Sequence, residues 1–236
     1  MKKLQLINEG KGKRVYATDD PNVVLISYKD EAVAFNGLKR ATITNKGVLS
    51  NRINNLLMQM LEKNGVPTHF IEEIADRESL MKKVEMLPLE IVVRNMVAGS
   101  LAGRIGLPEG SRLKKTILEF CYKNEELGDP MVNEYHITAM GWATEKELKQ
   151  IADYCFKIDK LLSRFLKQHG IELIDFRLEF GKTADGTLVL ADEISPDTAR
   201  FWDSKTHEKM DKDRFRRDMG GVEDAYQEIL HRLLED

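Results

Sequence analysis

Two acidic residues, Glu179 and Asp192, have the spacing in this sequence that most clearly suggests chemistry. They lie in the runs 173–181 and 188–192, on either side of Ala-Asp-Gly-Thr at 184–187. Asp-Gly between apolar runs is typical of a two-residue hairpin turn. Such a turn would place Glu179 directly opposite Asp192, where two like charges about 5 Å apart repel by up to about 3 kcal/mol at an effective dielectric of about 20. We therefore expect a cation between them, and hard oxygen ligands favour Mg²⁺.

The alternation of side chains in the first run supports this interpretation. One face of the strand carries charges at Asp175, Arg177 and Glu179. The other face is wholly apolar and must be core, because side chains alternate along a strand. A turn one residue longer would break the pairing of the two acids. A half-exposed strand with solvated charges would then explain the same alternation.

Phosphate chemistry is suggested by Lys11 and Lys13 in the segment Gly-Lys-Gly-Lys at 10–13. Glycines let a backbone approach phosphates closely, and lysines supply positive charge. The segment matches neither a Walker loop nor the pattern G-x-G-x-x-G, because Val15 stands where the third glycine would be. A glycine-rich hairpin turn with exposed lysines is the alternative.

Two further segments could bind an anionic substrate. Arg94 ends an apolar strand and is followed by Ser100 at the start of a short helix, so that a guanidinium and a hydroxyl could converge on an anion. An ordinary strand-to-helix connection explains this segment equally well. The segment Ser195-Pro196-Asp197-Thr198-Ala199-Arg200 follows Asp192 directly. Its aspartate could accept from ribose hydroxyls and its arginine could grip a phosphate, whereas the alternative is a plain turn.

Weaker candidates lie in two polar stretches. Lys123 and Asp129 belong to a polar loop that could form a lid. Arg216 is the best candidate in the mixed-charge run 212–217, although such a run is usually a solvated helix face. The five histidines are scattered, and we assign none of them a catalytic role.

The elements that must position these residues indicate an α+β fold. Hairpins dominate, strands come first and helices are interspersed, which argues against a doubly wound parallel sheet. Leu87-Pro88 is the best candidate for a hinge between two lobes. The expected strands are 4–7, 23–28, 70–74, 80–86, 90–95 and the hairpin 173–192, and the expected helices are 48–61, 145–169 and 222–234.

Composition narrows the class of protein. The chain has 236 residues, 42% hydrophobic and 32% charged, which suits a globular protein with a sizeable core. A net charge of −3 gives no support to general nucleic-acid binding. We expect no signal segment and no membrane span. The two cysteines, Cys121 and Cys155, are expected to be reduced thiols of a cytoplasmic protein.

Two long motifs bring in a family resemblance. The stretch from Leu87 through Arg94 to Ser100 and the stretch Leu173–Gly181 resemble the signature motifs of the phosphoribosylaminoimidazole-succinocarboxamide synthase (SAICAR synthetase) family. The segments 10–13, 129–133 and 195–197 also match, in order. The resemblance implies a two-lobed fold similar to ATP-grasp and kinase architectures, with an antiparallel-sheet ATP-binding lobe at 1–84 and a mixed α+β substrate- and metal-binding lobe at 85–236. It implies an ATP- and Mg²⁺-dependent ligase of purine biosynthesis.

The family implies that L-aspartate is joined to the carboxylate of carboxyaminoimidazole ribonucleotide (CAIR), giving the succinocarboxamide, ADP and phosphate, in a cytoplasmic homodimer. It also implies a role for each matched residue. Nucleotide binding falls to Lys11, Lys13, Lys82, Val84 and Met86, and Mg²⁺ binding to Glu179 and Asp192. CAIR binding falls to Arg94, Ser100, Ser195, Asp197, Arg200 and Arg216. The catalytic group is Asp175, Arg177, Lys123 and Asp129.

This chain departs from the family pattern at two positions. Arg177 stands where the signature usually has lysine, so charge stabilisation is retained but a role for a titratable amine is not. Asn36 stands where some relatives have aspartate, which argues against a general base at this position.

Two rival functions are compatible with the sequence: a small-molecule kinase that uses the same cleft, and a nucleotide-binding regulatory module without turnover. The paired acids argue against the regulatory module, because binding alone rarely needs a metal there. Dependence of ADP release on aspartate would distinguish the ligase from the kinase.

Overall fold

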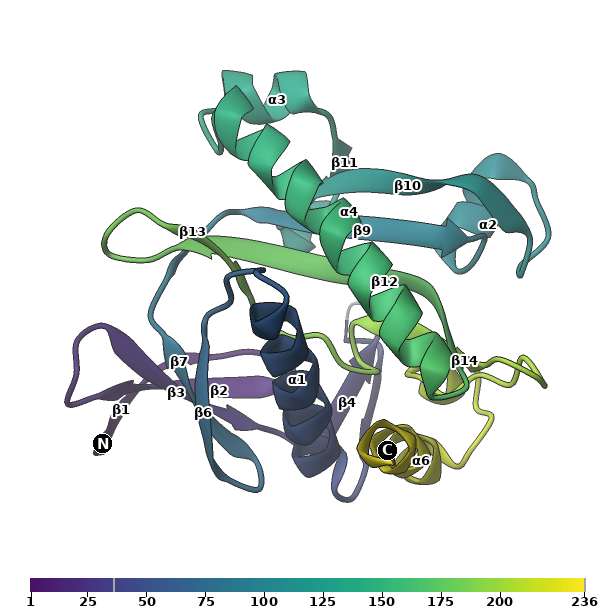
Figure 1. The fold of residues 1–236 in the computed structure, drawn as a ribbon, viewed down its shortest axis with the longest axis horizontal. Coiled ribbons are helices and arrows are strands. Elements are labelled where there is room, and N and C mark those ends of the chain that lie inside the picture. Colours follow the sequence, from purple (N-terminus) through teal and green to yellow (C-terminus); the bar gives the residue numbers. More distant parts are fainter. Residues whose placement is uncertain (36, 236) are drawn as a thin grey trace.

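The computed structural model describes residues 1–35 and 37–235, so the expectation about Asn36 lies outside the described residues. Its architecture confirms the α+β prediction: two antiparallel sheets lie beside each other and helices cover them (Figure 1). In the part of the chain described, no helix is both long enough and apolar enough to cross a membrane.

The N-terminal part of the chain forms a five-stranded antiparallel sheet. Helix α1 (Lys46–Lys63) packs on two of its strands, β3 (Val23–Tyr28) and β6 (Phe70–Ala75), through buried residues that include Ile53 and Leu57. A separate hairpin of β4 (Glu31–Ala34) and β5 (Lys39–Thr42) stands next to it. The order in the sheet is β1 (Lys3–Glu9), β2 (Lys13–Thr18), β3 (Val23–Tyr28), β7 (Glu78–Lys82) and β6 (Phe70–Ala75).

The second sheet is built around one long strand, β12 (Ile171–Lys182), which carries the charged alternation noted above. As expected, its apolar face is core: Ile174, Phe176 and Phe180 are fully buried. The other strands are β8 (Glu85–Met86), β9 (Leu89–Met96), β10 (Arg112–Tyr122), β11 (Met131–Val132), β13 (Leu188–Ala191) and β14 (Ala199–Asp203), in the order β11-β10-β9-β12-β13 with β8 and β14 also paired to β12.

The helices lie close to where the sequence predicted them. The capping box at Thr144 and Glu147 is confirmed, and it starts α4 (Glu145–Gln168), which crosses the second sheet in Figure 1. The C-terminal helix α6 (Val222–Leu234) has the predicted bounds and packs against α1. The remaining helices are short: α2 (Ser100–Ile105), the 3₁₀ turn η1 (Glu125–Leu127), α3 (Glu134–Ala139) and α5 (Asp213–Arg216).

The predicted strand 80–86 is divided between the two sheets. β7 ends at Lys82 in the first sheet, whereas β8 pairs with the end of β12 in the second. Sheet membership therefore changes close to the predicted boundary between residues 84 and 85. The division of the chain at residues 84 and 85 stays a prediction, because α6, from the C-terminal part of the chain, packs on α1 of the N-terminal part.

The predicted register of the hairpin is wrong by one residue. Glu179 pairs with Ala191, not with Asp192. The turn is longer than two residues because Asp185 folds its side chain back, accepting from the Thr183 hydroxyl and from the Thr187 N–H. Asp192 follows the last residue of β13, and its backbone adopts the left-handed conformation with φ 55°.

Candidate active site

Two adjoining cavities of about 540 and 560 Å³ bring together most of the predicted site residues. The first, here called the arginine cavity, is lined by Arg94, Ser100, Arg200 and Arg216. The second, here called the acidic cavity, is lined by Lys13, Lys123, Glu179, Asp192 and Glu193. Residues that line both cavities mark their common boundary: Lys11, Val33, Asp129, Arg177, Asp197, Thr198 and Lys212.

Arginines and buried carboxylates alternate along the wall of the arginine cavity and fix one another in place. Asp175, only 3% exposed, accepts from Arg94 Nη1 at 2.7 Å and from Arg200 Nη1 at 2.9 Å. Arg94 Nε also donates to Glu119 at 2.8 Å, and Arg200 Nε donates to Asp213 at 2.9 Å. Each guanidinium is therefore fixed by two carboxylates. Asp175 therefore holds two arginines in place, and the catalytic role that the family resemblance implies for it stays a prediction.

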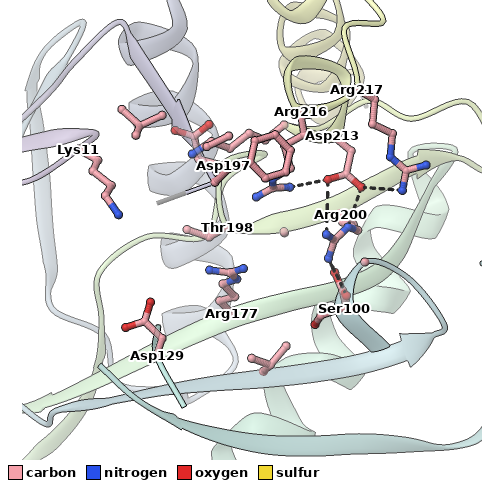
Figure 2. A pocket seen from close by; sticks show the side chains of 18 of the residues that line it. Lys11, Ser100, Asp129, Arg177, Asp197, Thr198, Arg200, Asp213, Arg216 and Arg217 are labelled. Carbon is pink, nitrogen blue, oxygen red and sulfur yellow. Dashed lines mark hydrogen bonds and ion pairs between the residues drawn. The ribbon is translucent and has the colours of Figure 1, made fainter. Parts of the chain in front are cut away.

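Further residues complete this cavity. Arg216 Nη1 binds the second oxygen of Asp213 at 2.5 Å, and Figure 2 shows Arg200, Asp213, Arg216 and Arg217 linked along one side. The Ser100 hydroxyl lies 3.4 Å from Arg94 Nη2. Gly99 has φ +54°, and a Cβ at this position would collide with the Arg200 guanidinium. Only glycine suits this backbone and this close approach.

In the acidic cavity, Glu179 and Asp192 are close enough to interact, although they are not cross-strand partners. Burial raises the pKa of Glu179 to about 7, and the negative charge of Asp192 adds to that effect. Burial also opposes ionisation of Asp192, but Lys13 at 2.5 Å holds its pKa below the ordinary value. Lys123 binds Glu179 at 2.5 Å. Two carboxylates and two lysines therefore converge. The sequence predicted Glu179 and Asp192 for a metal site, Lys13 for a phosphate site and Lys123 for the catalytic group, and these roles stay predictions.

His69 explains how Asp192 reaches this position. Its Nε2 lies 3.0 Å from the Asp192 carbonyl oxygen, and burial lowers the pKa of the ring to about 4. The neutral ring therefore donates from Nε2 to that carbonyl. This contact helps to fix the left-handed backbone at Asp192 that turns its carboxylate toward Lys13. No role was expected for His69 from the sequence, and its contact with Asp192 makes it a positioning residue.

Arg177, where this chain departs from the family signature, lies at the boundary between the two cavities. Arg177 is half exposed, donates to Glu90 at 3.2 Å, and lies between Asp129 and Thr198 in Figure 2. Asp129 has a left-handed backbone, φ 50°, and accepts from the Asn124 N–H. Lys11 forms an ion pair at 2.7 Å with Glu125, and both residues line the acidic cavity.

Four predicted residues lie away from both described cavity linings. Lys82 donates to the Thr68 carbonyl, and Val84 packs closely on Gly181, where a Cβ would come within 2.7 Å of it. Met86 pairs with Gly181 on β8. Ser195 is fully buried beneath the loop that carries Asp197, and its hydroxyl donates to Glu193 at 2.5 Å. We therefore treat Ser195 as a support of the loop.

The structure adds residues that sequence reasoning missed. Lys46 binds Asp197 at 2.5 Å, and Tyr226 donates to the other oxygen of the same carboxylate at 2.8 Å. Lys46 carried a usable signal: it opens α1, whose first turn holds no acid, and a cation is unfavourable at a helix N-terminus. Lys212 and Asp213, within the run interpreted as a solvated helix face, line the arginine cavity instead.

The comparisons with known proteins now identify the family. The family model described as SAICAR synthetase matches residues 6–233.

The chain belongs to the SAICAR synthetase family. It is 58% identical over 233 residues to the phosphoribosylaminoimidazole-succinocarboxamide synthase of Coprothermobacter proteolyticus, with 99% of each chain covered. The corresponding synthase of Clostridium botulinum is 57% identical with the same coverage. As a member of this family, the chain is a ligase of purine biosynthesis that uses ATP to join L-aspartate to CAIR.

Solved SAICAR synthetases share the fold. The crystal structure from Ehrlichia chaffeensis has a TM-score of 0.95 at 45% identity, covering 97% of this chain and 98% of that one. A SAICAR synthetase solved in complex with ADP has a TM-score of 0.94 at 45% identity, covering 97% of both chains. The two-lobed architecture predicted for this family is therefore the fold of this chain.

Proposed function

We propose that the two cavities divide the substrates of the ligation between them. The acidic cavity binds the phosphates of ATP together with Mg²⁺, and the arginine cavity binds the phosphate of CAIR. The carboxylate to be activated then lies at the common boundary, near Arg177. The observation that carries this proposal is the shared boundary between one cavity of paired acids and lysines and another of arginines.

The arginine cavity suits a phosphate monoester. Arg94, Arg200 and Arg216 are already fixed by buried carboxylates, so little side-chain freedom is lost when the anion binds. Planar guanidiniums match phosphate oxygens in pairs. The Asp197 carboxylate, at the edge of this cavity, retains lone pairs that could accept from ribose hydroxyls.

The acidic cavity suits Mg²⁺. Glu179 and Asp192 supply two hard carboxylates that interact electrostatically. Among the described residues, no group of three or more acidic, histidine or cysteine side chains converges on a metal site. Two carboxylates are nonetheless enough, because Mg²⁺ usually binds one or two carboxylates and takes its other ligands from water and substrate phosphates. When bound, the ion would neutralise charge on the nucleotide phosphates.

The residues of this chain then act on the reacting groups. A carboxylate is a poor acyl donor, so transfer of the terminal phosphoryl group of ATP to the CAIR carboxylate gives an acyl phosphate and ADP. The aspartate amine forms the C–N bond as the C–O bond to phosphate breaks, and phosphate leaves. Lys11, Lys13 and Arg177 stabilise the charge that develops on the transferred group. The segment 82–86 is proposed to face the adenine.

Phosphate release, measured with CAIR, ATP and Mg²⁺ in the presence and absence of L-aspartate, tests the overall reaction. We expect sustained release only with aspartate. A small-molecule kinase would instead release ADP at the same rate without it. Positional isotope exchange in ATP without aspartate tests the acyl phosphate; its clean absence, with binding demonstrated, would count against a stable intermediate.

Asp192→Asn tests the metal assignment. We expect it to abolish turnover while the far-UV circular dichroism spectrum is unchanged. Asp185→Asn, in an exposed acid at the tip of the same hairpin, is the matched control and should keep wild-type turnover. Near-normal activity of the Asp192 variant would remove the basis for the metal site.

The family also implies a cytoplasmic homodimer, and both properties are proposals for this chain. Exposed apolar side chains at Leu127, Met131, Tyr135 and Met140, around η1 and α3, support a contact surface in this region. Sedimentation at micromolar concentration tests the assembly. A monomer under those conditions would contradict the dimer.

A further inference from the structure

A continuous chain of buried polar contacts joins the acidic cavity to the arginine cavity, and Glu193 is its central member. Glu193 is 6% exposed, and each of its carboxylate oxygens has a partner. Oε1 lies 3.0 Å from Lys13 Nζ, and Oε2 accepts from the Ser195 hydroxyl at 2.5 Å. The Ser195 hydroxyl in turn accepts from the Asp197 N–H at 3.1 Å. One carboxylate therefore contacts a lysine of the acidic cavity directly and, through Ser195, the backbone of Asp197, which lines both cavities.

At the nucleotide end, Glu193 fixes the direction of Lys13. An ammonium has three N–H donors. Asp192 accepts from one of them at 2.5 Å, and Glu193 forms an ion pair with the same ammonium at 3.0 Å, so that donors remain for a ligand in the acidic cavity. Removing Glu193 would leave Lys13 with a single carboxylate to hold it, and its ammonium would be free to turn away.

At the CAIR end, the chain fixes the backbone of Asp197. Its two carboxylate oxygens are held by Lys46 and Tyr226, which come from helices α1 and α6. Its N–H is held by Ser195, and through Ser195 by Glu193. Helix α1 also reaches this segment through Asn54, which accepts from the Ile194 N–H at 3.0 Å. The side chain of Asp197 is thus anchored by helices, whereas its backbone is anchored by Glu193.

We propose that Glu193 is a positioning residue that couples nucleotide binding to CAIR binding. The proposal rests on the division of substrates described above. A nucleotide phosphate that fixes Lys13 also fixes Glu193, and through Ser195 it fixes the loop that faces the CAIR ribose. Because hydrogen bonds in such a buried chain strengthen one another, each ligand makes the site for the other better ordered.

Calorimetric titration measures this coupling directly. The probes are the Mg²⁺ complex of the non-hydrolysable imido analogue of ATP, and CAIR without L-aspartate. For the wild-type enzyme we expect CAIR to tighten analogue binding by at least about fivefold, and the analogue to tighten CAIR binding by the same factor. In Ser195→Ala the factor should fall to about one, because the link is cut while Lys13 and the paired acids stay in place.

Glu193→Gln provides a second variant of equal volume, in case the serine variant does not fold. An amide cannot accept from both Lys13 and Ser195, so the coupling factor should again fall to about one. Glu125→Gln is the matched control, because Glu125 contacts the other phosphate lysine, Lys11, and belongs to a surface loop. Its coupling factor should equal that of the wild type.

Three results would overturn the proposal. The first is a wild-type coupling factor of one with both ligands bound. The second is weaker binding of each ligand in the Ser195 and Glu193 variants with the factor preserved, since a merely structural role gives that result. The third is a higher Mg²⁺ requirement in Glu193→Gln, which would make Glu193 a metal ligand. Failure of the analogue to bind, or unchanged analogue affinity in Lys13→Ala, would instead reject the division of substrates.

Discussion

The substitution Asp175→Asn separates a positioning role from a catalytic one. The Asp175 carboxylate is 3% exposed and accepts from Arg94 and Arg200 at 2.7–3.0 Å. Removing one partner of a buried ion pair destabilises a protein by about 3–5 kcal/mol. Each arginine keeps a second carboxylate, Glu119 or Asp213, so we expect the lower end, about 3 kcal/mol. For a chain of this size that corresponds to a melting temperature lower by about 6–12 °C.

The assay pairs thermal unfolding, followed by circular dichroism, with steady-state kinetics in CAIR. If Asp175 positions the arginines, the melting temperature falls as stated, and KM for CAIR rises by a larger factor than kcat falls. Asp153→Asn, in an exposed acid on α4, is the control and should change neither. A melting temperature within about 2 °C of wild type, together with a collapse of kcat, would refute this reasoning. Asp175 would then act on the reacting groups.

Three further predictions concern single residues. Gly99→Ala should lower the free energy of unfolding by about 1–3 kcal/mol, because alanine is strained in the left-handed backbone; urea unfolding measures this. It should also raise KM for CAIR by about 10-fold or more, because the new Cβ displaces Arg200, and steady-state kinetics measure that effect. His69, with a folded pKa of about 4 against 6.5 unfolded, binds its proton more readily in the unfolded chain. Its contribution to stability is therefore full above pH 6.5 and lost as the pH falls toward 4, by about 2 kcal/mol at pH 5. His69→Gln should remove this loss in urea unfolding at pH 7.5 and 5, and an unchanged pH profile would contradict it. Arg177→Lys should keep kcat within about tenfold of wild type, whereas Arg177→Gln should lower it by about 100-fold or more, and equal losses would show that geometry outweighs charge.

Local signals made the helices and the central strand predictable. The capping box at Thr144 and the apolar spacing of α1 depend on neighbouring residues, and the structure confirms them. The apolar face of β12 followed from simple alternation. The strand expected at 90–95 is β9, but its partner in the sheet, the long strand β10, was not predicted.

The site was predictable in its chemistry but not in its geometry. Glu179 and Asp192 do interact, but not as the directly opposed cross-strand pair that the sequence predicted. Side-chain hydrogen bonds of Asp185 lengthen the turn by one residue and so shift the register. Contacts between distant segments were beyond local patterns. Lys46 and Asp197 are 151 residues apart in the sequence, and nothing in either segment alone indicates that they meet.

The longer turn has a consequence for how this hairpin tolerates change during evolution. Asp192 is oriented by its own left-handed backbone, by His69 and by Lys13, none of which belongs to the tip of the hairpin. The tip at 183–187 is closed by its own hydrogen bonds. Length variation at the tip is therefore insulated from the paired acids. Insertions that accumulate there would alter the outline of the protein and leave its chemistry intact, which makes this tip a natural position for grafting a peptide or a label.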